Sequence, residues 1–119
     1  MKPHKNLDAW KFSFEFVKEI YLVTKVFPAD EKFGIISQIR RAAVSVPTNI
    51  AEGAARKSKK EFVYFLYVAE GSVSELDTLL SLSVELNFLD PAAANNLLLK
   101  LEIISKRIIG LIKKLESEL

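Results

Sequence analysis

The residues best suited to chemistry are six basic side chains between residues 38 and 60. In this stretch they face a single acid, Glu52, so the segment carries a charge of +5. The whole chain has 17 basic and 15 acidic residues, so its net charge of +2 comes entirely from this stretch. Clustered cations attract phosphate groups, which makes the stretch a candidate nucleic-acid site. The candidate residues are Arg40, Arg41, Arg56, Lys57, Lys59 and Lys60.

Four of these cations stand in five consecutive residues, Arg56-Lys57-Ser58-Lys59-Lys60, where one expected helix gives way to the next. Side chains at such a corner can spread outward and meet phosphates. Contacts of this kind bind the phosphate backbone of the nucleic acid with little recognition of base sequence, and they weaken steeply as salt is added. The alternative is that the cluster only keeps the surface soluble. Tyr64 and Tyr67, on the adjoining turns, could stack on bases, although tyrosines at helical spacing also serve cores and interfaces.

Groups that carry out catalysis or bind metals are mostly missing. His4 is the only histidine, which leaves no Glu-x-x-His pair of the kind that holds di-iron in helical bundles. The absence of cysteine excludes thiolate catalysis, disulfides and cysteine metal sites. Glu52, Glu70 and Glu75 could converge as acid and base, but nothing in their spacing favours that over salt bridges. We therefore expect a non-enzymatic protein with no metal and no cofactor.

The elements that must position the cations read as helices of a single domain spanning residues 1–119. Half of the residues are hydrophobic, and apolar side chains recur at alternating spacings of three and four, the period of a helix face. Short connections between helices favour antiparallel neighbours. The pattern predicts an all-α fold, an up-down-up-down, left-handed antiparallel four-helix bundle. Its helices are expected at about residues 7–26, 33–55, 59–87 and 91–115.

Three local signals set the helix boundaries. Pro28 disfavours helical geometry at the residue before it and cannot continue the first helix. Ser58 and Glu61 form a capping box, in which the serine oxygen accepts from the Glu61 amide and the carboxylate reaches back to the Ser58 amide. Asp90 followed by Pro91 is typical of an N-cap and first helical position.

Pro47 lies in the middle of the second expected helix. A proline there removes the hydrogen bond to the Ala43 carbonyl, which costs about 3 kcal/mol unless the helix bends. We expect a kink between Ala43 and Pro47, the alternative being two shorter helices that meet at residues 45–48. Asn49 could bond to groups freed near the proline.

The apolar surface is wider than one small bundle needs. In the first helix we assign one stripe to the core, and a second either to a broader core face or to contact with another subunit. The fourth helix has a similar surplus, so we expect a homo-oligomer. In the third helix Gly71 predicts close approach of another helix. The first stripe is Leu7, Trp10, Phe14, Val17 and Tyr21, and the second is Phe12, Phe16, Ile20, Val23 and Phe27.

The second helix combines an apolar seam with a polar line. On the polar line Glu52 and Arg56 form an i,i+4 pair. The line is either a solvated face or a polar seam between helices or subunits. The apolar seam is Ile36, Ile39, Ala43, Val46, Ile50 and Gly53, and the seam of the third helix is Phe62, Phe65, Ala69, Val73, Leu76 and Leu80.

Membrane insertion is not expected. No apolar run approaches the roughly 18 residues of a membrane span, and the residues Met1-Lys2-Pro3-His4-Lys5 lack the apolar core of a signal peptide. We therefore expect a cytoplasmic protein.

Residues 38–76 resemble a known family. The likeness rests on Gln38-Ile39-Arg40-Arg41-Ala42-Ala43-Val44-Ser45-Val46-Pro47-Thr48-Asn49-Ile50-Ala51-Glu52-Gly53, on Ser58-Lys59-Lys60-Glu61-Phe62 and on Ala69-Glu70-Gly71-Ser72-Val73-Ser74-Glu75-Leu76. The opening Leu7-Asp8-Ala9-Trp10 adds to it. On these residues the chain is similar to the bacterial four-helix-bundle family named for the 23S rRNA intervening sequence. Its fold is also similar to that of the accessory variability protein of diversity-generating retroelements.

The resemblance implies a ring-like homopentamer, with a nucleic-acid role for the six candidate cations. It also implies that Asn49, Glu52, Ser72 and Glu75 are structural polar contacts. Five copies would carry only about +10, so binding would depend on the ring concentrating charge on one surface. Two hypotheses follow: an oligomeric bundle that binds RNA or DNA, and a protein-interaction scaffold with no nucleic-acid role.

Overall fold

The computed structural model describes residues 2–119, and this part of the chain contains helices and no strand. The all-α class with four long helices is confirmed. The helix ends differ from the predicted ones by two residues at most. The elements are η1 (Pro3–Asn6), α1 (Asp8–Thr24), η2 (Ala29–Glu31), α2 (Ile35–Ala54), α3 (Lys59–Glu85) and α4 (Pro91–Ser117).

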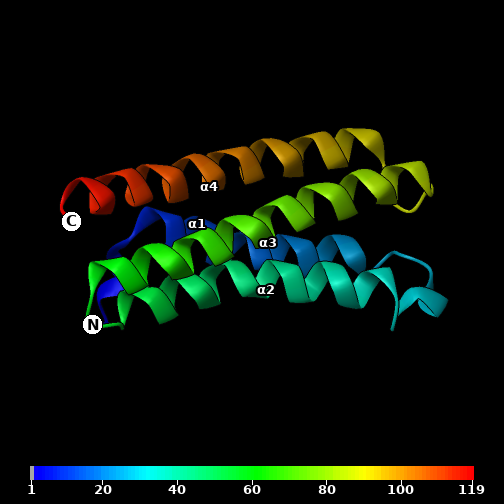
Figure 1. Cartoon of the computed structure of the whole chain (residues 1–119). Helices are drawn as coiled ribbons and strands as arrows, with labels where there is room; N and C mark the ends of the chain where they lie inside the picture. Colours follow the sequence, from blue (N-terminus) through cyan, green and yellow to red (C-terminus); the bar gives the residue numbers. More distant parts are fainter. Residues whose placement is uncertain (1) are drawn as a thin grey trace.

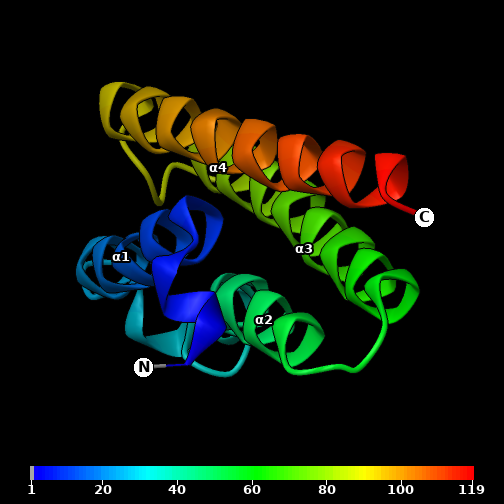
Figure 2. The same ribbon diagram turned by 90° about the vertical axis from the view of Figure 1, so that its left-hand side faces the viewer.

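The helices lie side by side in an elongated body that measures 46 by 22 by 21 Å. Figure 1 shows the chain crossing from one end of the body to the other and back in successive helices. The most extensive contact is between α2 and α3, followed by α3 with α4 and by α1 with α2, and α1 with α4 is the least extensive of the four contacts between long helices. The view turned by 90° shows α4 uppermost and α2 lower, with α1 and α3 on opposite sides of the bundle (Figure 2). The handedness of the bundle stays a prediction.

Side-chain caps fix where the third and fourth helices begin. The Ser58 hydroxyl accepts from the Glu61 amide at 3.1 Å, as predicted. The reciprocal half of the predicted capping box differs, because the Glu61 carboxylate accepts from the Ser58 hydroxyl at 3.2 Å and not from the Ser58 amide. The Asp90 carboxylate accepts from the amides of residues 92 and 93, with Pro91 at the first helical position. Between these helices Asn87 has φ 62°, the left-handed conformation that commonly ends a helix.

The second helix supplies much of the core and is continuous through Pro47, which excludes the alternative of two shorter helices. Pro47 is buried. Asn49 donates to the Ser45 carbonyl at 2.8 Å rather than to Ala43, whose carbonyl lost its partner to the proline. The kink stays a prediction. All members of the predicted seam are buried: Ile36, Ile39, Ala43, Val46, Ile50 and Gly53.

In α1 the second stripe supplies the broader core face, one of the two roles predicted for it, but the assignment of the whole first stripe to the core is wrong. Phe16, Ile20 and Phe27 of the second stripe are buried, whereas Phe14 and Tyr21 of the first are exposed. Both stripes are apolar at the same period, so the spacing alone could not rank them. The two stripes lie on either side of the face of α1 that points into the bundle. Ser13 and Thr24 lie on that face between the stripes, and they are therefore buried although they are polar.

The close helix approach predicted at Gly71 is also wrong, because a Cβ added there would meet no atom within 4 Å. The close approach is at Gly53 instead. A Cβ on Gly53 would lie 2.8 Å from the Cβ of Phe65 and 2.9 Å from Cδ1 of Phe62, so only glycine lets α2 and α3 pack at this distance. The remaining α3 seam is buried at Ala69, Val73, Leu76 and Leu80, and Phe62 and Phe65 are half-buried at its start.

Candidate nucleic-acid interface and interaction surfaces

The basic corner joins α2 to α3 through residues 55–58. The second helix ends where the Ala55 amide donates to the carbonyls of residues 51 and 52, and where the Arg56 amide donates to the Gly53 carbonyl at 3.1 Å. Because Ser58 then caps α3, the chain turns within four residues and carries Arg56 to Lys60 around one end of the bundle. The cations of the corner are therefore close neighbours, as predicted.

Two of the four corner cations are already paired. Arg56 bonds to the Glu52 carboxylate at 2.6 Å, and its guanidinium lies 4.9 Å from the centre of the Phe65 ring. Lys59 bonds to Glu118, near the end of α4, at 2.9 Å. The hydrogen bond from Lys59 and its charge lower the pKa of Glu118. Lys57 and Lys60 are exposed, and neither has an ion pair within residues 2–119.

Arg40 and Arg41 lie apart from the corner. They precede Arg56 by about four helical turns, which places them about 24 Å away along α2. The Arg40 Nε donates to the Thr24 hydroxyl at 2.9 Å, and its guanidinium lies 4.5 Å from the centre of the Tyr21 ring. Arg40 thereby joins the end of α1 to α2. Arg41 is exposed at the edge of a groove that Glu75 also borders.

The six predicted cations thus do not form one surface. Three have internal partners, and the other three divide between the corner and the middle of the bundle. The pattern of charges along the sequence could not show this, because Tyr21, Thr24 and Glu118 are brought to the cations only by tertiary packing. Among the six candidates, those with neither an ion pair nor a side-chain hydrogen bond within the described residues are Arg41, Lys57 and Lys60.

A small polar network joins α2 to α3. Ser72 is buried, and its hydroxyl donates to the Ser45 hydroxyl at 2.8 Å. The Asn49 side chain donates to the same Ser45 oxygen at 2.9 Å. Two of the four predicted polar contacts, Asn49 and Ser72, therefore meet at one serine between the helices. Glu52 bonds only within its own helix turn to Arg56, and Glu75 is exposed beside Arg41.

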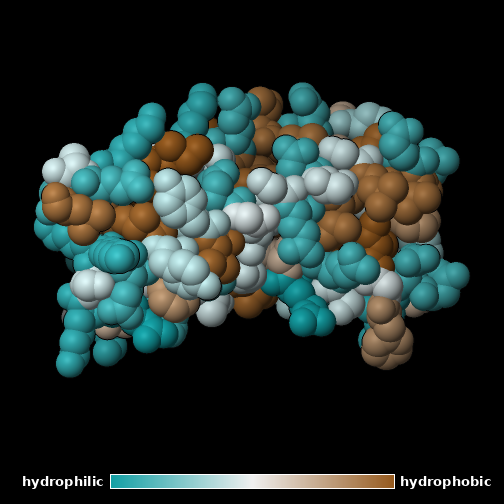
Figure 3. Space-filling view, viewed as in Figure 1, coloured by the Kyte–Doolittle hydropathy of each residue, from teal (hydrophilic) through white to brown (hydrophobic). Residues whose placement is uncertain are grey.

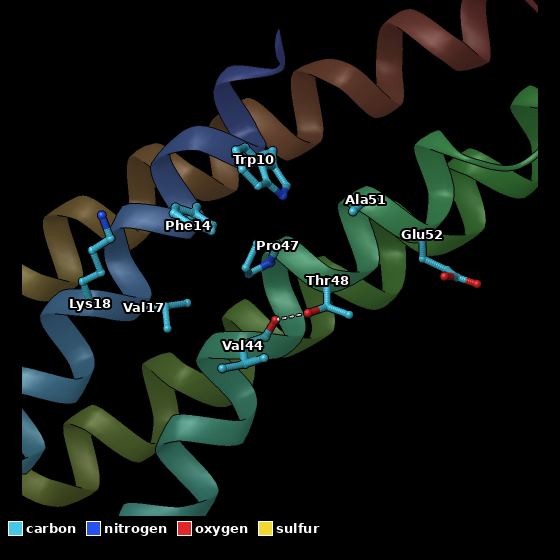
Figure 4. Close-up of a pocket in the computed structure, with 9 residues that line it drawn as sticks. All are labelled: Trp10, Phe14, Val17, Lys18, Val44, Pro47, Thr48, Ala51 and Glu52. Carbon is cyan, nitrogen blue, oxygen red and sulfur yellow. Dashed lines mark hydrogen bonds between the residues drawn. The ribbon is translucent and has the colours of Figure 1, made fainter. Parts of the chain in front are cut away.

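An apolar groove of about 520 Å³ separates α1 from α2. Figure 4 shows Trp10 and Phe14 of α1 facing Pro47 of α2 across it, and the Trp10 and Phe14 rings stack with centroids 4.7 Å apart. The dashed bond in Figure 4 joins the Thr48 hydroxyl to the Val44 carbonyl at 2.7 Å. Three members of the first α1 stripe border this groove: exposed Phe14, and Trp10 and Val17, which also pack against the core.

A second groove, of about 280 Å³, lies between α1 and α4. Phe12 and Phe16 border it from α1, and Ile103 borders it from α4. An ion pair between Lys100 and Glu19 bridges the two helices here. Phe12 and Ile103 are exposed at 39% and 49%, so the groove opens to solvent between incompletely covered apolar side chains.

Metal chemistry has no site in the described residues: within 2–119 no three His, Cys, Asp or Glu side chains come together as metal ligands. No helix in the same range is long and apolar enough to cross a membrane.

The profile of the 23S rRNA-intervening sequence protein family matches residues 5–110. The chain belongs to this family. A solved structure from Bacteroides thetaiotaomicron VPI-5482, a protein with unknown function from the S23 ribosomal protein family, has a TM-score of 0.81 to it at 24% sequence identity. The match covers 88% of this chain and 95% of that chain, and it shows that the two share a fold. No curated protein matches the sequence.

In this member of the 23S rRNA-intervening sequence family, a polar contact between α3 and α4 involves Glu70. Glu70 of α3 accepts a 2.6 Å hydrogen bond from the Ser105 hydroxyl of α4, while its second oxygen is buried and, in the described chain, without a partner. Burial raises the pKa of Glu70, and the bond from Ser105 opposes that rise. Sequence spacing gave no signal for this pair, because Ser105 lies 35 residues away on another helix.

Proposed function

We propose that the protein is a non-enzymatic bundle that assembles with copies of itself, and that the assembly binds RNA or DNA through phosphate contacts. The observation that carries the proposal is the incompletely covered apolar surface along α1 and α4. Figure 3 shows another face, over α2, α3 and α4, where brown apolar patches also lie among hydrophilic side chains. The exposed apolar side chains of the two helices include Phe12, Phe14, Leu22, Leu99, Ile103 and Ile109.

A second copy of the chain is the partner that best explains this surface. Exposed aromatic and aliphatic side chains are a liability for a monomer, and covering them with an equivalent surface removes that liability. The number of copies in the proposal, five, comes from the family resemblance. A closed ring would also bring several copies of Lys57 and Lys60 onto one particle, which raises the local positive charge that a chain of net charge +2 lacks.

Assembly is tested by sedimentation velocity or light scattering across a range of protein concentrations. We expect an oligomer for the wild type and a smaller species for the double variant Phe12→Ser/Ile103→Ser. Phe33→Ser is the matched control, because Phe33 is 90% exposed but lies in the connection before α2, away from the α1–α4 groove. A wild type that stays monomeric at high concentration would contradict the proposal.

Nucleic-acid binding is tested separately by gel shift with structured RNA and duplex DNA at two salt concentrations. We expect binding at low salt that weakens as salt is added, because phosphate contacts release counterions. The double variant Lys57→Gln/Lys60→Gln should bind more weakly and still assemble. Absence of binding at low salt would remove the nucleic-acid part of the proposal.

That result would leave the second candidate function, a protein-interaction scaffold. The α1–α2 groove favours it, because the groove is mostly apolar, has the size of a small binding site and is bordered by the stacked Trp10 and Phe14 rings.

A further inference from the structure

One face of α3 combines aromatic rings with the unpaired cations of the corner. Lys60, Tyr64, Tyr67 and Gly71 follow one another at spacings of four, three and four residues. At 3.6 residues per turn these positions fall within an arc of about 60° on the helix. Neighbours at such spacings have Cβ atoms about 5–6 Å apart. The four residues therefore form one continuous strip along α3, with Lys57 just before its start.

The two tyrosines of the strip are turned to solvent. Tyr64 is 63% exposed and Tyr67 is 54% exposed, whereas Val63 and Leu66 between them are buried. The Tyr64 ring meets the Phe65 ring edge-on, with centroids 5.3 Å apart, and the Arg56 guanidinium also lies over the Phe65 ring. Beyond Tyr67 the surface is open, because a Cβ on Gly71 would meet no atom within 4 Å. Flat molecules can thus reach both tyrosine rings.

The charge of the strip is concentrated at one end. Lys57 and Lys60 are exposed without an ion pair in the described chain, while Arg56 and Lys59 are held by Glu52 and Glu118. The nearest acid on α3 itself is Glu61, whose carboxylate accepts from the Ser58 hydroxyl at the cap. Two further acids lie beyond the tyrosines: Glu70, three residues after Tyr67, is bonded to Ser105 of α4, and Glu75 lies one turn beyond Gly71, at the end opposite the lysines. An anionic chain would therefore meet the lysines first.

We propose that this strip, together with Lys57 before its start, is a stacking platform for unpaired RNA. Exposed aromatic rings stack on bases of any sequence, and adjacent cations hold the phosphates between them. The bases of a duplex are already stacked on one another, so they cannot use the tyrosine rings. Bases in RNA loops, bulges and ends are free to do so, which favours unpaired RNA as the ligand. The proposal rests on the nucleic-acid part of the proposed function and adds the kind of strand to it.

The test measures fluorescence anisotropy of the full chain with three labelled probes: an unstructured RNA strand of about 16 nucleotides, DNA of the same sequence, and the RNA in a duplex. The double variant Tyr64→Leu/Tyr67→Leu keeps apolar bulk but loses the aromatic faces. It should bind the single RNA strand at least about tenfold more weakly and the duplex unchanged. The matched control, Tyr64→Phe/Tyr67→Phe, keeps the ring faces and should bind as the wild type does.

Each other outcome contradicts a different part. If Tyr64→Leu/Tyr67→Leu binds the single RNA strand as tightly as the wild type, the stacking platform is overturned. This holds even if Lys57→Gln/Lys60→Gln lowers the affinity for both the single RNA strand and the RNA duplex, a result that would support phosphate binding alone. If DNA of the same sequence binds more tightly than RNA, the choice of RNA is overturned. Loss of the oligomer in the leucine pair would show that the tyrosines lie between copies. A wild type that binds no probe at low salt removes the proposed nucleic-acid function itself, and the platform with it.

Discussion

Where α2 meets α3 the helices pack without room for a Cβ at Gly53, and Ser72 bonds to Ser45 across the contact. Where α1 meets α4 the helices touch least, and half-exposed Phe12 and Ile103 border the groove between them. Both contacts use apolar side chains at helical spacing, so hydrophobicity does not distinguish them. The difference lies in closeness of approach. It teaches that the α2–α3 pair is complete within one chain, whereas the α1–α4 side has apolar area left to bury.

The largest expected difference between the two sides concerns truncation of a large side chain. Leu66 of α3 is fully buried, so Leu66→Ala should lower the free energy of unfolding by about 2–5 kcal/mol, because it leaves a cavity. Ile103 of α4 is 49% exposed, and Ile103→Ala should cost less than about 1.5 kcal/mol. Urea unfolding at low protein concentration measures both. Equal losses at the two sites would show that the α1–α4 side is as well packed as the core.

The next largest effect compares alanine substitutions at two glycines, one in the close α2–α3 contact and one on an open surface. Gly53→Ala should lower the free energy of unfolding by about 1–2 kcal/mol, because the new Cβ would collide with Phe65 and Phe62 and force α2 and α3 apart. Gly71→Ala is the matched control on an open surface, and it should raise stability by up to about 1 kcal/mol through helix propensity. Thermal unfolding of the two variants gives the signs. Stabilisation by both would mean that the helices at Gly53 can separate without cost.

The two glycines also show how far the sequence could predict the fold. Helix number, the caps at Ser58 and Asp90, and the α2 seam follow from local chemistry and from the helix period, and the structure bears these out. Whether a glycine marks a close approach depends on a neighbouring helix far away in sequence. The same limit explains the wrong assignment in α1, where two apolar stripes compete and only the positions of α2 and α4 decide which is buried.

The candidate site was predictable to a smaller extent. Charge clustering located the corner, but it could not separate paired from unpaired cations. Lys59 meets Glu118 through the return of α4 to the corner, and Arg40 meets Thr24 through the packing of α1 on α2. Both pairings join residues that are distant in the sequence, so the spacing of residues along a helix could not predict them. The exposure of Tyr64 and Tyr67 likewise depended on which face of α3 the bundle buries.

A smaller effect tests the polar part of the α2–α3 contact. Ser72→Ala removes the donor to Ser45, so it should lower the free energy of unfolding by about 0.5–1.5 kcal/mol. The cost stays modest because Asn49 still donates to the Ser45 oxygen. Ser74→Ala, at an exposed position of the same helix, should leave stability almost unchanged in the same unfolding experiment. A loss at Ser74 as large as that at Ser72 would mean that the interhelical bond contributes nothing specific.

The smallest effect concerns α3 and α4, where Glu70 bonds to Ser105 but keeps one buried oxygen without a partner in the described chain. Burial raises the pKa of Glu70 above its ordinary value of 4.5, so the folded state holds this proton more tightly than the unfolded state does. The contribution of Glu70 to stability should therefore be greatest below pH 4.5, and it should decline as the pH rises through the higher pKa of the folded state.

The side chain in Glu70→Gln cannot ionise, so the difference in free energy of unfolding between this variant and the wild type should grow in favour of the variant over that pH range. A pH-independent difference for Glu70→Gln would mean that the buried oxygen is solvated in solution, and that the α3–α4 contact, like the α1–α4 groove, is open to water.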